Sequence, residues 1–357
     1  MRFETDISPL VGSQNSISAI MRRVIWALIP GTALAVVILG WGVLTNVLLA
    51  VVAAVFFEAV MLFLRQRPVG FYLGDYSAVV AGWILGLCLP TLAPWWIPIV
   101  ASGFAIVLGK QLFGGLGYNP FNPAMVGYVV MLVSFPKQMT FWAAPWGTDG
   151  IRLNFTESLR WTFFEELPSH LQFDAVTMAT PLDAVRTRLS LGDESMAYIE
   201  QQSIFGLLAG QGSEWVALAF LAGGLWMIYK KIIRWHIPVA MLGALAIIAT
   251  VFWLIDADRY GSPLFHLLAG GTMLGAFFVA TDPISSSTTE RGRLIFGAGV
   301  GILAYLIRSF GSYVDGVAFA VLLMNMAVPL IDYYTQPKVF GHKSQPKTAS
   351  NKTSKGQ

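Results

Sequence analysis

The sequence predicts an all-α polytopic membrane protein with about ten transmembrane helices. Three observations support this fold class. Hydrophobic residues make up 55% of the chain and charged residues only 12%, whereas an average soluble protein carries roughly 25% charged residues. Most apolar residues fall in blocks long enough to cross a hydrocarbon core of about 30 Å. Charge, glycine and proline bound these blocks, as they bound transmembrane helices.

The apolar blocks predict ten helices along the chain. They span residues 24–40, 43–64, 77–93, 95–113, 120–135, 214–230, 237–255, 263–280, 293–308 and 314–331. Pro90, Pro94 and Pro98 interrupt the third and fourth blocks, which predicts half-helices or tilted helices. Irregular backbone at that depth must lie within protein or line a cavity.

These helices divide the chain into five parts. The parts are an N-terminal segment 1–23, helices over 24–135, a long loop 136–213, helices over 214–331 and a tail 332–357. The tail is polar and poor in aromatic residues, so we expect it to be disordered. Five helices lie on each side of the loop, so the second half enters the membrane with the opposite topology. This arrangement is compatible with two inverted five-helix halves.

The basic residues predict the orientation of the helices. Ten of them fall on one side of the predicted membrane, together with five lysines of the tail: Arg22, Arg23, Arg65, Arg67, Lys110, Lys230, Lys231, Arg234, Arg291 and Arg293. The loop 136–213 instead carries nine acidic and five basic residues. Because basic loops stay in the cytoplasm, we expect cytoplasmic N- and C-termini and an external, periplasmic loop.

Composition also excludes several classes of function. The net charge is only +3 and the basic residues lie in short loops and the tail, which suits a membrane surface and not nucleic acid. A single cysteine, Cys88, can form no internal disulfide and cannot supply the four thiolates of an iron–sulfur cluster. The sequence has no phosphate loop and no strand–Gly-x-Gly-x-x-Gly–helix unit. We predict no catalytic residues and no metal site.

One segment of the loop presents a threonine for covalent modification. It runs from Phe173 to Asp183 and contains Thr-Met-Ala-Thr-Pro over 177–181. Proline holds the preceding residue, Thr180, in extended backbone, which leaves its hydroxyl accessible to another protein. Taken alone, the pattern is more typical of an ordinary Thr-Pro turn ahead of a helix.

In its context the segment resembles the flavinylation site of the RnfD and NqrB families, in which a Ser/Thr-Gly-Ala-Thr motif carries FMN by a phosphoester to its last threonine. The resemblance makes Thr180 the acceptor; Thr177, Ala179 and the upstream Asp174 also match, and Met178 replaces the glycine. Further segments resemble the families, at 73–77, 114–124, 281–283 and 290–293. The length and the Ala-Thr-Pro-Leu-Asp ending are more similar to RnfD.

The resemblance implies an electron-carrying subunit of the Rnf (Rsx) complex in the bacterial inner membrane, an ion-translocating oxidoreductase that links NADH and ferredoxin chemistry to Na⁺ or H⁺ movement. It implies the other Rnf subunits and a flavin transferase as partners. NADH and iron–sulfur chemistry would then reside on those subunits, so this chain would not be catalytic alone. Its contribution would be to bind and position flavin, which performs the redox step.

The families also hold a second, noncovalent flavin, riboflavin, near the cytoplasmic side. Asn119 and Asn122 are our candidates for its polar edge, because an amide offers both donors and an acceptor. Equally, the two asparagines describe a turn and the cap of the fifth helix, with Pro123 in its first turn.

Glu58 is the one acid well inside a predicted helix, and intramembrane acids are costly enough to suggest function. We expect either a cation or proton pathway or pairing with a neighbouring helix or subunit. For Lys110 we expect a side chain that reaches the cytoplasmic headgroups. His266 and Asp315 are expected in hydrated structural roles near the outer boundary.

Two other function classes remain open. Inverted halves with proline-broken helices also suit a solute channel or transporter without redox activity. A purely structural anchor for redox subunits is the third class. A covalent flavin would distinguish the electron-carrying subunit from the channel or transporter and from the structural anchor.

Overall fold

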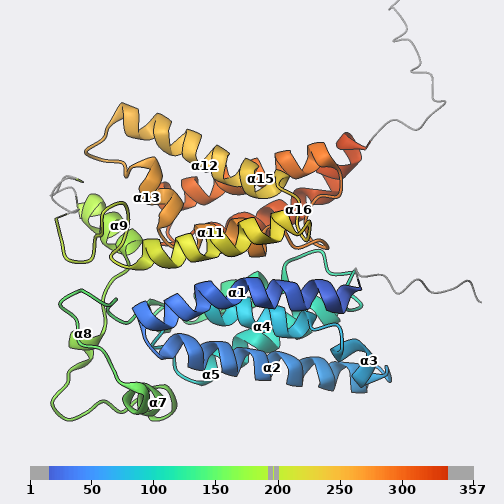
Figure 1. The fold of residues 1–357 in the computed structure, drawn as a ribbon, viewed down its shortest axis with the longest axis horizontal. Helices are drawn as coiled ribbons and strands as arrows, with labels where there is room; N and C mark the ends of the chain where they lie inside the picture. The colour runs from blue at the N-terminus through green and yellow to red at the C-terminus, as the bar shows by residue number, and fades with distance from the viewer. Residues whose placement is uncertain (1–15, 192–195, 197–200, 337–357) are drawn as a thin grey trace, which may run out of the picture.

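The computed structural model describes residues 16–191, 196 and 201–336. Within these ranges the chain is helical and contains no strand; the only β-type pairings are isolated bridges, Ala143 with Thr177 and Phe205 with Gly210. The helices form two groups, one from each half of the sequence (Figure 1).

The first group occupies the lower part of Figure 1. It contains α1 (Ile17–Leu39), α2 (Gly42–Leu64), α3 (Val69–Leu73), α4 (Ser77–Cys88), α5 (Trp96–Gly103), which continues as the π-helix η1 (Phe104–Gln111), and α6 (Pro123–Ser134). Helix α2 packs along α4 and α5.

The second group occupies the upper part. It contains α11 (Ser213–Tyr229), α12 (His236–Ile255), α13 (Pro263–Leu268), α14 (Thr272–Leu274), the π-helix η3 (Gly275–Val279), α15 (Glu290–Phe310) and α16 (Val317–Thr335). Helices α1 and α11 lie side by side where the groups meet.

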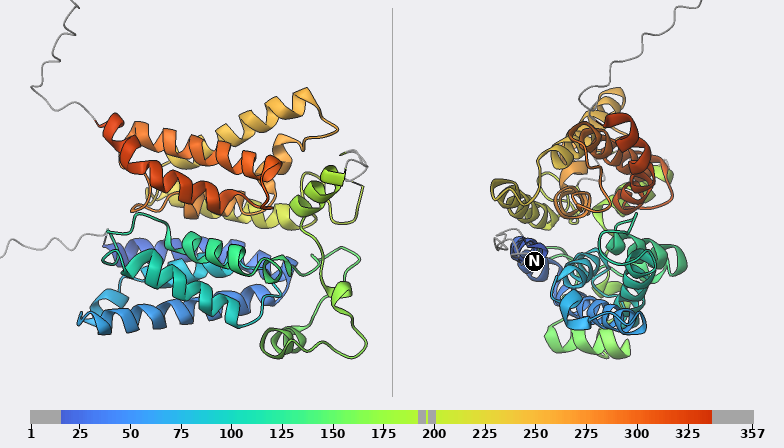
Figure 2. Two further views of the ribbon diagram at one scale, coloured as in Figure 1. Left: turned by 180° about the vertical axis from the view of Figure 1, so that it is seen from behind. Right: turned by 90° about the vertical axis from the view of Figure 1, so that its right-hand side faces the viewer.

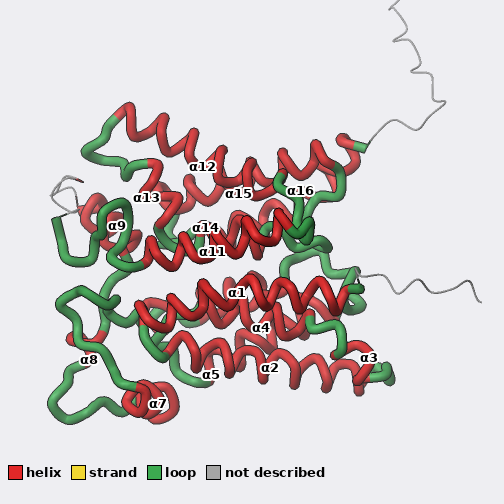
Figure 3. The backbone as a smooth tube through the Cα atoms, in the orientation of Figure 1, coloured by secondary structure: helices red, strands yellow, loops and turns green. Residues whose placement is uncertain are grey.

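The connection between the groups gathers at one end of the molecule, which we call the loop end (Figure 3). It contains η2 (Gln138–Thr140), α7 (Phe155–Phe164), α8 (Phe173–Val176) and α9 (Pro181–Leu191). Helix α7 lies across the direction of the long helices, as the right panel of Figure 2 shows. The described chain begins and ends at the opposite end, which we call the termini end.

Each of the ten predicted segments is helical over most of its length. Five helices are long and apolar enough to cross a membrane: α1, α2, α12, α15 and α16. Four further apolar stretches are shorter: α4, α5 with η1, α6 and α11. Length and composition therefore support a membrane protein, as the sequence predicted.

Several predicted boundaries differ from the observed helix ends by a few residues. Helix α1 begins at Ile17, inside the predicted segment 1–23, because Ser16 accepts a hydrogen bond from the Ala19 N–H. Helix α16 continues to Thr335, so residues 332–335 of the predicted tail 332–357 belong to this helix. Residues 337–357 of that tail lie outside the described residues.

The predicted break is present in the third helix, whereas the fourth is continuous from Trp96 to Gln111, with Pro98 in its first turn. Helix α4 ends at Cys88, and the irregular backbone that follows is buried at Thr91 and Leu92. Its carbonyl groups are satisfied from elsewhere: the Asn46 amide donates to the Pro90 carbonyl at 2.7 Å, and the Trp161 indole to the Leu92 carbonyl at 2.8 Å. These bonds pair two carbonyl groups of the non-helical backbone inside the protein.

Glycine allows the long helices to approach closely. A Cβ at Gly86 of α4 would lie 2.6 Å from the Val47 Cα of α2, and one at Gly297 of α15 would lie 2.6 Å from the Ile237 carbonyl oxygen of α12. Small residues that bring backbones into contact are typical of helix packing in membranes.

Candidate functional site

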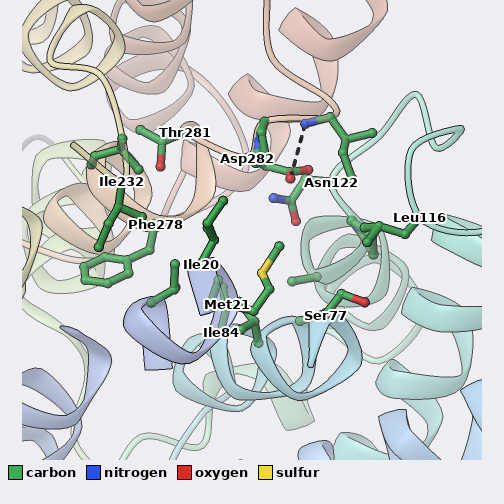
Figure 4. Close-up of a pocket in the computed structure, with 18 of the residues that line it drawn as sticks. Ile20, Met21, Ser77, Ile84, Leu116, Asn122, Ile232, Phe278, Thr281 and Asp282 are labelled. Atoms are coloured by element: carbon green, nitrogen blue, oxygen red, sulfur yellow. Dashed lines mark hydrogen bonds between the residues drawn. The ribbon is translucent and has the colours of Figure 1, made fainter. Parts of the chain in front are cut away.

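A pocket opens at the termini end, between the two groups of helices (Figure 4). Its volume is about 120 Å³. Its walls are mostly apolar and come from α1, α4, α11 and η3; its polar lining consists of Ser77, Lys110, Asn119, Asn122, Thr281 and Asp282. In the close-up, Asn122 and Asp282 extend into the space from opposite groups. The pocket therefore combines segments that are far apart in the sequence.

The two predicted asparagines both line this pocket and are buried. Asn122 caps α6, since its Oδ1 accepts from the Met125 N–H at 3.3 Å, and its Nδ2 donates to the Val279 carbonyl at 3.2 Å. The capping alternative thus describes Asn122. Asn119 differs, because its Nδ2 donates to the Phe121 carbonyl at 3.0 Å while its buried Oδ1 has no partner among the described residues.

Asn325 is a polar residue of this region that the sequence analysis missed. It lies buried in α16, accepts from the Asn122 N–H at 3.1 Å and donates to the Ser285 carbonyl at 2.8 Å. A single asparagine within an apolar helix is the signal that could have identified it.

Glu58 belongs to a buried charged cluster beside the pocket. Its Oε1 lies 2.5 Å from the Lys110 Nζ of η1, and both side chains are only 2% exposed. The Gln111 amide donates to the same oxygen at 3.1 Å, and Lys110 also donates to the Ser77 hydroxyl at 2.6 Å. Ser77 in turn donates to Asp75 at 2.5 Å.

This cluster corrects one expectation and distinguishes between two others. Lys110 does not reach the headgroups, because Glu58 and Ser77 hold its ammonium group inside the protein. For Glu58 we expected either an ion pathway or pairing with a neighbouring helix or subunit, and the structure shows a pair with Lys110 of the neighbouring η1. Burying two charges is costly, and the short contact with added hydrogen bonds offsets that cost.

The flavinylation-like segment lies at the loop end. Thr180 is half-buried, and its hydroxyl accepts from the Asp183 N–H at 3.3 Å, which is the contact of an N-cap on α9. Ala179 and Asp174 are exposed. Thr177 donates to the Phe173 carbonyl at 3.0 Å.

A second pocket, of about 390 Å³, lies beside Thr180. Its lining residues are Met178, Ala179, Asp183, Ala184, Thr187, Gln202, Ser203 and Ile204. Burial raises the pKa of Asp183, and the Arg186 charge partly opposes that rise. Thr180 therefore lies at the start of α9, next to Ala179, which lines this pocket.

A second charge pair, in which Arg308 is buried and Asp315 is partly exposed, lies beside the broken helix of the second group. The Arg308 guanidinium contacts Asp315 at 2.9 Å and donates to the His266 carbonyl at 2.9 Å, while Asp315 accepts from the Gly271 N–H at 2.8 Å. His266 is 6% exposed, so the hydrated role expected for it was wrong. The sequence analysis did not single out Arg308, because it is the last residue of the predicted helix 293–308.

Known proteins resemble this chain over almost its whole length. A sequence model described as the NQR2, RnfD, RnfE family matches residues 4–341. A protein of Salmonella arizonae, named as a subunit of an ion-translocating oxidoreductase complex, is 49% identical over 351 residues, which cover 96% of this chain and 99% of that protein. The protein of the same name from Cronobacter sakazakii is 49% identical over 350 residues, covering 96% and 100%.

Proposed function

Because the chain belongs to the NQR2, RnfD, RnfE family, we propose that it is a membrane subunit of an ion-translocating electron transport complex. Its role is to carry electrons across the bacterial inner membrane, coupled to Na⁺ or H⁺ movement, within a complex that links NADH and ferredoxin chemistry. The relatives are named as one subunit of an ion-translocating oxidoreductase complex, which supports this role and implies other subunits as partners.

In this proposal all ten helical segments cross the membrane as two inverted five-helix halves. The order of elements supports it, with α1, α2, α4, α5–η1 and α6 corresponding to α11, α12, α13–η3, α15 and α16. In each group the second helix packs against the third and fourth elements. The termini end, where the basic residues gather, faces the cytoplasm, and the loop end faces the periplasm.

Thr180 carries FMN through a phosphoester formed by a flavin transferase. The observation that supports this assignment is the position of its hydroxyl, partly exposed at the first turn of α9. A phosphate on an N-cap residue meets the free N–H groups and the positive end of the helix dipole. The neighbouring pocket of about 390 Å³ gives the attached ring a place beside the loop.

A noncovalent riboflavin occupies the pocket at the termini end. The residues present fit such a group: apolar side chains meet the ring faces, and the unpartnered Asn119 Oδ1 accepts from a ring N–H. The Asn122 amide is already engaged by Met125 and Val279, so it shapes the pocket wall. When bound, flavin supplies the electron-carrying chemistry, and the chain's residues hold and orient it.

The Glu58 carboxylate is the candidate group for the ion pathway. It is buried at 2% exposure, and its Oε2 has no partner among the described residues. A hydrogen-bonded series leads from it through Lys110 and Ser77 to the partly exposed Asp75.

One observation favours a second function, a solute channel or transporter. Both groups contain a broken helix, which is the usual position of a permeation site in transporters built from inverted repeats. The two functions separate on a denaturing gel of the chain coexpressed with its flavin transferase. A fluorescent band supports the redox function, and a band without flavin refutes it.

A further inference from the structure

Lys110 lines the pocket at the termini end and also forms the buried pair with Glu58. An ammonium has three N–H donors. Two of them go to Glu58, at 2.5 Å, and to Ser77, at 2.6 Å. The described residues provide no third acceptor, and Lys110 lines the pocket. A cationic N–H is therefore available to a ligand there.

The pocket also presents one unpaired acceptor. The Oδ1 of Asn119, which is 3% exposed, has no partner among the described residues. The other lining side chains are mainly apolar, from Ile20 and Met21 of α1 to Phe277 and Phe278 of η3, and they include the carboxyl group of Asp282. A flat apolar ring whose edge carries both an N–H and an electron-rich carbonyl matches this lining.

From this geometry we propose that Lys110 makes the pocket bind the reduced flavin more tightly than the oxidised flavin, and that Glu58 limits the effect. The inference rests on the noncovalent flavin proposed above. Two electrons and one proton, taken from a reductant, convert the neutral ring into an anion with one charge. The Lys110 charge attracts that anion inside a poorly screened interior. Tighter binding of the reduced form raises the reduction potential.

The carboxylate of Glu58 opposes this attraction because it neutralises Lys110 at 2.5 Å. The pair therefore sets the potential by its charge balance. A purely structural pair, which only joins α2 to η1, would leave the potential unchanged when its charge is altered.

The test uses the full-length chain within its purified complex, with Thr180→Ala in every sample so that this chain keeps only the noncovalent flavin. Riboflavin is quantified by acid extraction and chromatography, and its potential by a dithionite titration followed in absorbance. Glu58→Gln leaves Lys110 charged and uncompensated, whereas Lys110→Met with Glu58→Gln removes both charges. Ser102→Ala is the control, since Ser102 is buried in α5 and donates to the Ala50 carbonyl away from the pocket.

We expect the two variants to move the potential in opposite directions. Glu58→Gln should favour the reduced form at least tenfold, a rise of about 30 mV for a two-electron couple. The double variant should disfavour it by a smaller factor, because it removes the Lys110 charge together with the Glu58 charge that offsets it, and Ser102→Ala should match the parent. If the double variant fails to accumulate, the required rise in Glu58→Gln still tests the inference.

Retained riboflavin with an unchanged potential in Glu58→Gln would overturn the role of Lys110 and leave the second flavin in place. Absence of riboflavin from the parent would overturn both the second flavin and this inference. The proposal that Thr180 carries covalent FMN is tested separately, in the chain with Thr180 intact, and does not depend on either result.

Discussion

The backbone N–H of Asn122 donates to the side-chain oxygen of Asn325 at 3.1 Å, across 203 residues of sequence. The same Asn325 donates to the Ser285 carbonyl. One buried side chain of α16 therefore joins the turn before α6 to the loop that follows η3. The wall of the termini-end pocket depends on this junction, because Asn122 is part of its lining.

Asn325→Ala should lower stability by about 1–3 kcal/mol, because it leaves the Asn122 N–H or the Ser285 carbonyl buried and unpaired. We expect a lower temperature for loss of the monodisperse peak in detergent and weaker retention of extractable riboflavin. Thr250→Val is the control, since Thr250 bonds only the Ala246 carbonyl of its own helix. Equal effects of the two variants would contradict the role of Asn325.

Thr180→Ala should abolish the covalent FMN adduct, because it removes the only oxygen that the proposed phosphoester uses. Thr177→Ala should retain the adduct, since the Thr177 hydroxyl is already donated to the Phe173 carbonyl. Fluorescence of the denatured band and peptide mass mapping measure both. An adduct mapped to Thr177 would assign the FMN to that residue instead of Thr180. A wild-type chain without an adduct would refute the covalent FMN.

A reporter fused after Gly212 should behave as exported, and one fused after Lys338 as cytoplasmic. The expectation follows from the basic residues at the termini end and the acidic loop 136–213. Alkaline phosphatase and green fluorescent protein fusions report the two compartments. The opposite result at either point would be inconsistent with ten crossings.

Glu58→Gln should keep covalent FMN but weaken ion transport, because the amide preserves shape and hydrogen bonding while it loses the charge. Reconstituted complex is assayed for electron flux and for the membrane voltage it builds. Moving one charge across 100 mV requires about 2.3 kcal/mol, so reduced coupling appears as a lower voltage at the same flux. An unchanged voltage at unchanged flux would show that Glu58 serves its pair with Lys110 and not transport.

Arg308→Met should be destabilising by about 1–3 kcal/mol, since it leaves the partly exposed Asp315 carboxylate and the His266 carbonyl without the guanidinium donor. In this pair the Arg308 side chain is 1% exposed and the Asp315 side chain 25%. The matched control is Arg234→Met, which breaks a pair with Glu290 whose side chains are 60% and 68% exposed and should cost at most about 1 kcal/mol. Thermal stability in detergent compares the two; similar losses would contradict the importance of burial.

The helical segments were predictable because each depends on its own residues. The proline-broken helix after Cys88 and the Thr180 turn at the start of α9 follow from local rules about proline and capping. Helix ends were less accurate, since the Ser16 cap extends α1 beyond the apolar block that marked it.

The sequence by itself determined the membrane class, the positions of the helices and the candidacy of Thr180, Glu58 and Asn119, because block length, charge and motif are local properties. Only the tertiary structure decided the partners of the buried polar groups. It places Lys110 against Glu58, 52 residues away, where the sequence predicted a side chain extended to the headgroups. The physical reason is that a buried charge is stable only opposite its partner, and which helix faces meet is a property of packing across the whole chain.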